Sequence, residues 1–250
     1  MPIFLPKSGI LDSMLDIPAG NIPGYSGVNK FGRNPNIASG ATEEIWDGSA
    51  TYYFPTTTEI TTVGQAADQL AMRDKDVEIQ GLDANWDLTV QTATLNATDT
   101  STTVAITTPL IRVFRVKVMT NVVTDQNVVI SSDSGLRTFA LALAGNNQTL
   151  MAIYTVPNDK TAYMTSWYTS VNPATNLDPT AMPIRLWARD NDNSFEKQIK
   201  HIHGIISGHV QHFYQPYNKF TQKTDLWFDA TPTGKAADVS TGFDLILRNN

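Results

Sequence analysis

Cysteine is absent from this sequence of 250 residues, and basic residues are few. Without cysteine the chain has no disulfide, no thiolate zinc site and no cysteine nucleophile. Only 18 Lys and Arg oppose 24 Asp and Glu, which gives a net charge of −6. A protein that binds nucleic acid needs a basic face to neutralise phosphates, so we expect no nucleic-acid partner.

Long apolar runs are also missing. No stretch approaches the 18 residues that a membrane-spanning helix requires, so we expect no membrane partner. The first residues, Met1–Lys7, lack a basic leader followed by a long apolar stretch, and we therefore expect synthesis in the cytoplasm rather than secretion. Charged residues make up 17% of the chain, below the usual quarter.

What the sequence has instead is β-branched residues in short alternating runs. Residues 112–119 are the clearest run: Phe114, Val116 and Val118 share one face, and Arg115 and Lys117 share the other. Similar runs separated by turn residues predict strands near 50–63, 76–82, 86–96, 102–107, 111–120, 127–131, 136–143, 149–156, 161–171, 183–189, 195–206, 209–214, 225–230 and 238–248. The segment Gln65–Met72 is the one helix expected in this part. The pattern predicts an all-β protein, an antiparallel β-sandwich of jelly-roll type.

The first 45 residues differ in composition because proline and glycine alternate along them. We expect no long regular element there, apart from a short helical turn within 8–15. Regular apolar anchors distinguish the segment from a polar linker and suggest an assembly arm. We predict an extended N-terminal arm over 1–45, packed on its own domain or on a neighbouring subunit, a β-sandwich domain over 46–250, and a surface loop at 172–181. The anchors are Ile3, Phe4, Leu5, Ile10, Leu11, Leu15, Ile22, Tyr25 and Phe31.

The four histidines all lie between residues 201 and 212. In a strand His201 and His203 share a face, and a turn at Ser207-Gly208 could bring His209 and His212 alongside. Such a cluster would bind a metal ion or titrate near neutral pH. His209 and His212 face opposite sides of a regular strand, which favours ordinary strand residues, and we assign no metal site.

Two acidic groups have simpler interpretations than chemistry. Residues Asp190–Asn193 begin like a calcium loop, but Phe195 and His201 stand where that loop needs its glycine and its glutamate, so a hydrated turn is favoured. Glu44 and Asp47 would form an acid–base pair only within a cleft, and we favour a loop anchored by Trp46. No nucleophile elbow, phosphate loop or dinucleotide motif is present. We expect no catalytic residue, no cofactor and no enzyme activity.

Aromatic residues on the predicted strands suggest a sugar-binding surface or, alternatively, core packing. These residues are Trp167, Tyr168, Trp187, Tyr214, Trp227 and Phe228. A glycan adhesin built on the sandwich would expose Trp167, Trp187 or Trp227, and we keep it as an alternative function.

Four groups of sequence segments together resemble a family of virion structural proteins of tailed bacteriophages, common among marine phages. The segments are 29–35 with 43–48 and 52–55, then 77–95, then 144–157, and finally 238–247. The resemblance spans residues from about 20 to 247, and it implies a non-enzymatic component of the particle without identifying any functional residue.

The expected function is therefore that of a phage virion structural protein, most simply a capsid decoration or cement protein that stabilises the lattice. Its partners would be copies of itself, as a homo-oligomer and most simply a trimer, and the major capsid protein or another virion protein. A tail or neck accessory protein is the alternative in the same class. Copy number distinguishes the two, because a cement protein is present in hundreds of copies.

Overall fold

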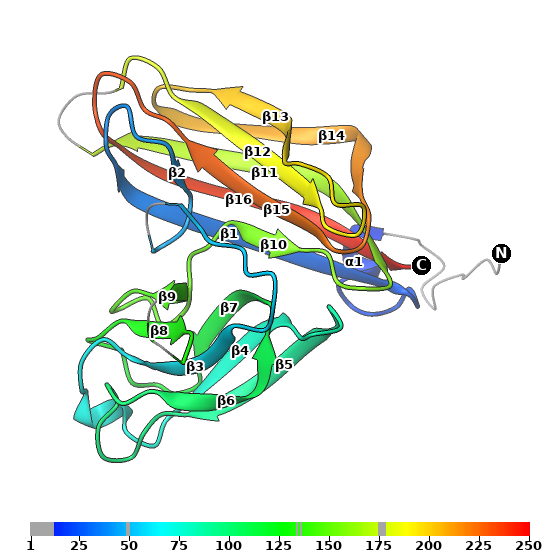
Figure 1. Ribbon diagram of the computed structural model, residues 1–250. Helices are drawn as coiled ribbons and strands as arrows, with labels where there is room; N and C mark the ends of the chain where they lie inside the picture. Colours follow the sequence, from blue (N-terminus) through cyan, green and yellow to red (C-terminus); the bar gives the residue numbers. More distant parts are fainter. Residues whose placement is uncertain (1–12, 49–50, 134, 136, 175–178) are drawn as a thin grey trace.

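The protein consists of a β-sandwich with a second, smaller β body inserted into it (Figure 1). The structure is a computed structural model, and it describes residues 13–48, 51–133, 135, 137–174 and 179–250. Within these residues no helix is long and apolar enough to cross a membrane. The elements are α1 (Ser13–Asp16), β1 (Tyr25–Ile37), β2 (Glu43–Glu44), β3 (Ile60–Gln65), the 3-10 helix η1 (Leu70–Met72), β4 (Asp76–Leu82), β5 (Leu88–Thr94), β6 (Val104–Leu110), β7 (Arg112–Val118), β8 (Val128–Ser131), β9 (Thr138–Ala142), β10 (Ile153–Thr155), β11 (Lys160–Pro173), β12 (Pro183–Asp190), β13 (Gln198–Gly204), β14 (Gly208–Phe220), β15 (Thr224–Ala230) and β16 (Ala237–Asn249).

Two antiparallel sheets form the sandwich. One has the order β1-β16-β11-β14, and the other has the order β10-β15-β12-β13, with β2 paired to β15. We leave out the strands of the inserted body and the short strand β2, and number the remaining eight strands from 1 to 8 along the chain. The two orders then become 1-8-3-6 and 2-7-4-5. Apart from the consecutive strands β12 and β13, neighbours in both sheets therefore come from separate parts of the sequence. The all-β sandwich expected from the alternating pattern is confirmed.

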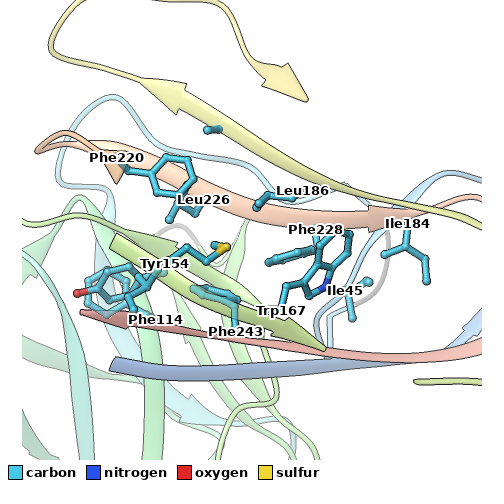
Figure 2. Close-up of a cluster of buried hydrophobic side chains, with 14 of the residues drawn as sticks. Ile45, Phe114, Tyr154, Trp167, Ile184, Leu186, Phe220, Leu226, Phe228 and Phe243 are labelled. Atoms are coloured by element: carbon cyan, nitrogen blue, oxygen red, sulfur yellow. The ribbon is translucent and has the colours of Figure 1, made fainter. Parts of the chain in front are cut away.

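The sandwich core lies between the two sheets, as Figure 2 shows. Trp167 of β11, Phe228 of β15 and Phe243 of β16 meet there and are fully buried. Alternation explains the selection, because every second side chain of a strand points to the same face. In β15 both faces are covered: Leu226 and Phe228 enter this core, while Trp227 enters the core of the inserted body. All seven residues of β15 are accordingly buried.

The inserted body is made by residues 60–142. It contains the sheets β6-β3-β8-β9 and β5-β4-β7, around a separate cluster that includes Val63, Ile79, Val116 and Phe139. We expected one two-sheet body over residues 46–250, and the structure differs by having two hydrophobic clusters. Apolar and polar residues alternate in the strands of both bodies in the same way. The alternation therefore does not indicate which strands belong to which body.

The predicted arm also differs from what the structure shows. Tyr25–Ile37 is a regular strand, β1, paired with β16 over almost its whole length, so the expectation that the first 45 residues hold no long regular element is wrong for these residues. Glycine and proline are tolerated because β1 is the last strand of its sheet. Gly32 is also required there, since a Cβ at this position would lie 2.2 Å from the amide nitrogen of Ala152.

Most other predicted strands coincide with observed ones to within a few residues. Two local predictions need correction. The strand expected at 50–63 begins only at Ile60, and the helix expected over Gln65–Met72 is a single 3-10 turn at Leu70–Met72, with Gln65 ending β3. The surface loop expected at 172–181 overlaps the end of β11, and residues 175–178 lie outside the described residues.

Candidate functional site: an open side of the sandwich

Strands β13 and β14 are the outermost strands of the two sheets at one lateral side of the sandwich. We call residues 195–220, which contain both strands, the β13–β14 side. Each strand pairs with a single neighbour, β13 with β12 and β14 with β11. The outer edge of each strand is therefore without a partner strand in the described part of the chain, and such edges are where sheets contact other chains.

Large apolar side chains are exposed along this side. Ile202 is 51% exposed and Phe213 is 62% exposed, and each alternates with inward-pointing neighbours on its strand. The β13–β14 side holds six of the thirteen large apolar side chains that are exposed in the described residues: Phe195, Ile199, Ile202, Ile206, Phe213 and Tyr217. Scattered apolar residues are normal on a surface, whereas a concentration of this kind indicates an interaction site.

Charges of both signs accompany the apolar residues. A pocket of about 290 Å³ opens at one end of this side, between Glu196 and Lys200 on one strand segment and Lys219 on the other. Phe195 also lines this pocket. Mixed charges around exposed apolar groups resemble a protein–protein interface, where a polar rim surrounds an apolar centre.

The opposite lateral side of the sandwich is not open in this way. There β1 lies against the segment that leads into β10, and Gly32 meets the backbone of Met151 and Ala152 closely. The inserted body covers this region through contacts of β7 with β10. In Figure 1 the inserted body lies below β1 and β10, away from β13 and β14. Of the two lateral sides, the β13–β14 side is the one left to a partner.

Three of the four histidines gather between the sheets at this open side. The ring centroid of His212 lies 4.5 Å from that of His201 and 6.4 Å from that of His203. His203 also stacks on Trp167, with centroids 3.5 Å apart. His201 and His203 share a face, as predicted. His209 instead is exposed on β14 opposite Ser170, so the four-histidine cluster does not form.

Burial makes the charged forms of His201 and His203 costly. Desolvation, aided by the neighbouring His201 and His212, lowers the pKa of His203 to about 4. Desolvation and His212 likewise lower the pKa of His201. Within the described residues, Nδ1 of His203 has no hydrogen-bond partner, and no group of three or more His, Asp or Glu is placed to hold a metal ion. Burial therefore disfavours the charged forms of His201 and His203 at this open side.

The acidic loop that precedes the inserted body holds backbone amides in place. Oε2 of Glu44 accepts a hydrogen bond from the amide of Tyr52 at 3.1 Å, and Oδ2 of Asp47 accepts one from the amide of Leu150 at 2.9 Å. Desolvation raises the pKa of Glu44 to about 7 and that of Asp47 to about 6. Trp46 between them is buried against Tyr52, which agrees with the anchored loop that we favoured.

The segment Asp190–Asn193 forms a turn closed by its own carboxylate. Oδ1 of Asp190 accepts hydrogen bonds from the amides of Asp192 and Asn193, at 3.0 and 3.1 Å. Thr221 donates to Oδ2 of the same side chain. Both carboxylate oxygens of Asp190 thus accept hydrogen bonds, and the segment forms the turn that the sequence predicted.

The aromatic residues mostly fill cores rather than form a sugar platform. Trp167, Trp227 and Phe228 are buried, and Trp227 packs parallel to Trp187 at 6.2 Å. Trp187 is only half-buried, but its Nε1 donates to Asp229 and Lys197 lies over its ring. The exposed tryptophans that the adhesin alternative requires are thus missing at residues 167 and 227.

The predicted assembly arm divides into two parts. Ile3, Phe4, Leu5, Ile10 and Leu11 lie outside the described residues, and their role stays a prediction. Leu15 lies in α1 and is 65% exposed. Ile22 before β1, and Tyr25 and Phe31 within it, are half-buried. The exposed residues of the β13–β14 side were missed by the sequence analysis. The sequence held an indication of them, because Ile199, Ile202 and Phe213 occupy positions of the predicted strands that alternation would leave to polar residues.

Comparisons with known proteins identify no family. No protein-family model and no curated protein matches the chain. Among solved structures, a chain from the structure of infectious bursal disease virus, Gx strain, shares 8% identity with a TM-score of 0.23, covering 90% of this chain and 77% of that one. A chain from the structure of the Gt strain shares 8% identity with a TM-score of 0.15, covering 100% and 83%. Likeness at this level supports no conclusion about fold or function, and the bacteriophage family suggested by the sequence is not identified by these comparisons.

Proposed function

We propose that this protein is a structural, non-catalytic component of a virus particle, and that it joins copies of itself through the β13–β14 side. The observation that carries the proposal is the concentration of exposed apolar side chains on and next to β13 and β14, two edge strands whose outer edges have no partner strand among the described residues. A surface of this kind is unfavourable in a free monomer and becomes favourable when a second surface covers it.

The strand order supports a particle role. We interpret the orders 1-8-3-6 and 2-7-4-5 as those of a jelly roll, an architecture in which two Greek keys build the two sheets. Viral capsid domains use this architecture, although lectins and cupins use it too, so the fold favours the role without establishing it. The resemblance of the sequence to virion structural proteins favours the same conclusion. Within this class we propose a capsid decoration protein that assembles as a trimer.

A second copy of this chain is the occupant that fits the β13–β14 side best. The side offers Glu196 together with Lys197, Lys200 and Lys219, so each copy brings both an acceptor and donors for ion pairs across the contact. Pro216 lacks an N–H group and interrupts continuous strand pairing along β14. The contact would therefore be formed mainly by side chains.

The test is the oligomeric state of the purified full chain, measured by sedimentation velocity. We expect a defined oligomer for the natural sequence, and a monomer for Ile202→Lys and for Phe213→Lys with an unchanged circular dichroism spectrum. Val123→Lys is the matched control, because Val123 is 63% exposed on the inserted body, and it should leave the oligomer intact. A natural chain that stays monomeric at high concentration would contradict self-association.

The particle role is tested separately, by quantitative mass spectrometry of purified virions. Hundreds of copies per particle are expected for a decoration protein. A few to tens of copies would favour the tail or neck alternative, and a chain absent from virions would overturn the particle role.

A further inference from the structure

Lys30 is a buried lysine at the contact between the sandwich and the inserted body. It lies on β1, is only 4% exposed, and its Nζ donates to the carbonyl oxygen of Phe114 on β7. Burial and the charge of Arg115 hold the pKa of Lys30 well below its usual value. No carboxylate is among the groups that shift the pKa of Lys30. Its environment is unusual, because a buried basic side chain is normally paired with an acid.

Arg115 is a second cation at the same place. It follows Phe114 on β7, and its Nη2 donates to the carbonyl oxygen of Asn29 at 3.1 Å. Among the described residues neither Lys30 nor Arg115 forms an ion pair within 4.0 Å. An ammonium has three donors and a guanidinium has five, so both groups retain hydrogen-bonding capacity beyond one carbonyl each. In a chain with a net charge of −6, two adjacent basic side chains that form no ion pair within 4.0 Å among the described residues are unexpected. Glu78, an acid on the neighbouring strand β4, accepts a hydrogen bond from Gln80 of the same strand at 2.8 Å.

Both cations line a pocket between the two bodies. Its volume is about 350 Å³, within the usual range for small-molecule sites. Tyr154 and Phe114 form its inner wall, and Figure 2 shows these two rings side by side at one end of the sandwich core. Leu88 and Val90, on the same face of β5, lie at its rim and are more than half exposed.

This combination selects a class of ligand. The guanidinium of Arg115 and the amine of Lys30, whose protonation a nearby anion favours, have spare donors for an anion. The planar guanidinium of Arg115 also suits the two oxygens of a carboxylate. Apolar rings and exposed aliphatic side chains favour an apolar group attached to that anion. We propose that this pocket binds a small carboxylate bearing a short apolar tail, with the carboxylate beside Lys30 and Arg115 and the tail against Tyr154, Leu88 and Val90.

Calorimetric titration of the full chain with hexanoate tests the proposal, with hexan-1-ol and acetate as probes that lack the charge or the tail. Hexanoate should bind at least about tenfold more tightly than either, as expected from loss of one charged hydrogen bond or of the buried tail. Lys30→Met and Arg115→Gln should each weaken hexanoate binding about tenfold. Lys117→Met is the matched control, because Lys117 is an exposed cation two residues along the same strand, and it should bind as the natural chain does.

A further measurement covers the case in which Lys30→Met does not fold. A bound carboxylate favours the charged amine, so hexanoate binding should take up protons, which titrations in buffers of different ionisation enthalpy detect. Equal binding of hexanoate and hexan-1-ol, or binding that Arg115→Gln leaves unchanged, would overturn the proposal. The outcome is independent of self-association, because Lys30 and Arg115 lie outside the β13–β14 side.

Discussion

Nε of Arg112 lies 2.8 Å from Oδ1 of Asp225, and this ion pair joins the inserted body to the sandwich. A second bond runs from Nη2 to Oδ2 at 3.0 Å, so the contact is bidentate. Asp225 is fully buried and also accepts from Arg189, Asn191 and Thr155. Burial alone would raise the pKa of Asp225, but the positive charges and hydrogen bonds around it outweigh burial and lower that pKa.

Removing the charge of Asp225 should therefore be costly. We expect Asp225→Asn to lower the free energy of unfolding by about 3–5 kcal/mol, because it leaves two arginines facing an uncharged group in a buried site. Urea denaturation measures the loss. Asp238→Asn is the control, since Asp238 pairs with Arg33, whose side chain is half exposed, and should cost about 0.5 kcal/mol. Equal effects of the two substitutions would contradict this account.

Gly32 fixes the approach of β1 to the segment before β10. We expect Gly32→Ala to destabilise the protein by about 2 kcal/mol or more, because a methyl group would meet the backbone of Ala152 and Ile45. Thermal unfolding measures the effect. Gly27→Ala on the same strand is the matched control, since its added methyl would find only ordinary contact with Pro18. The explanation fails if both variants unfold at the same temperature.

Glu44 should make the protein less stable as the pH rises towards neutrality. Its pKa in the folded protein, about 7, is above the ordinary 4.5, so folding favours the protonated form and stability declines between these two values. We expect Glu44→Gln to raise the free energy of unfolding by about 1 kcal/mol at pH 8 and to have little effect at pH 4. The control is Glu196→Gln, on an exposed residue. A destabilising effect of Glu44→Gln at pH 8 would contradict the prediction.

His203 should make the protein less stable as the pH falls, which is the opposite of the effect expected from Glu44. Its pKa in the folded protein, about 4, is below the ordinary 6.5, so stability is present above pH 6.5 and is lost as the pH falls towards 4. His203→Phe retains a ring against Trp167 and cannot be protonated. Denaturation at pH 7 and pH 4.5 should show an acid loss smaller by about 1 kcal/mol in this variant, while His209→Phe should behave as the natural chain. An acid loss in His203→Phe equal to that of the natural chain would contradict the prediction.

Alternation and turn residues in the sequence were sufficient to predict most of the individual strands. The run around Phe114 and Val116 is an example: a polar residue at every second position requires an extended backbone with one buried face. The same reasoning identified Trp46 as a loop anchor and predicted a turn at Asp190. These features are local, so they depend only on neighbouring residues.

The tertiary structure decided which strands are neighbours. Predictions from the sequence were wrong where they depended on which distant segments pair. β1 is a strand because β16, more than 200 residues away, supplies its partner, and a segment rich in glycine and proline gives no local sign of it. Long-range packing likewise determines three other features. They are the two separate cores, the Arg112–Asp225 ion pair, and the grouping of His201, His203 and His212. Local propensity determines backbone shape over a few residues, whereas charge pairing, burial and exposed edges depend on contacts between distant segments, which that propensity does not specify.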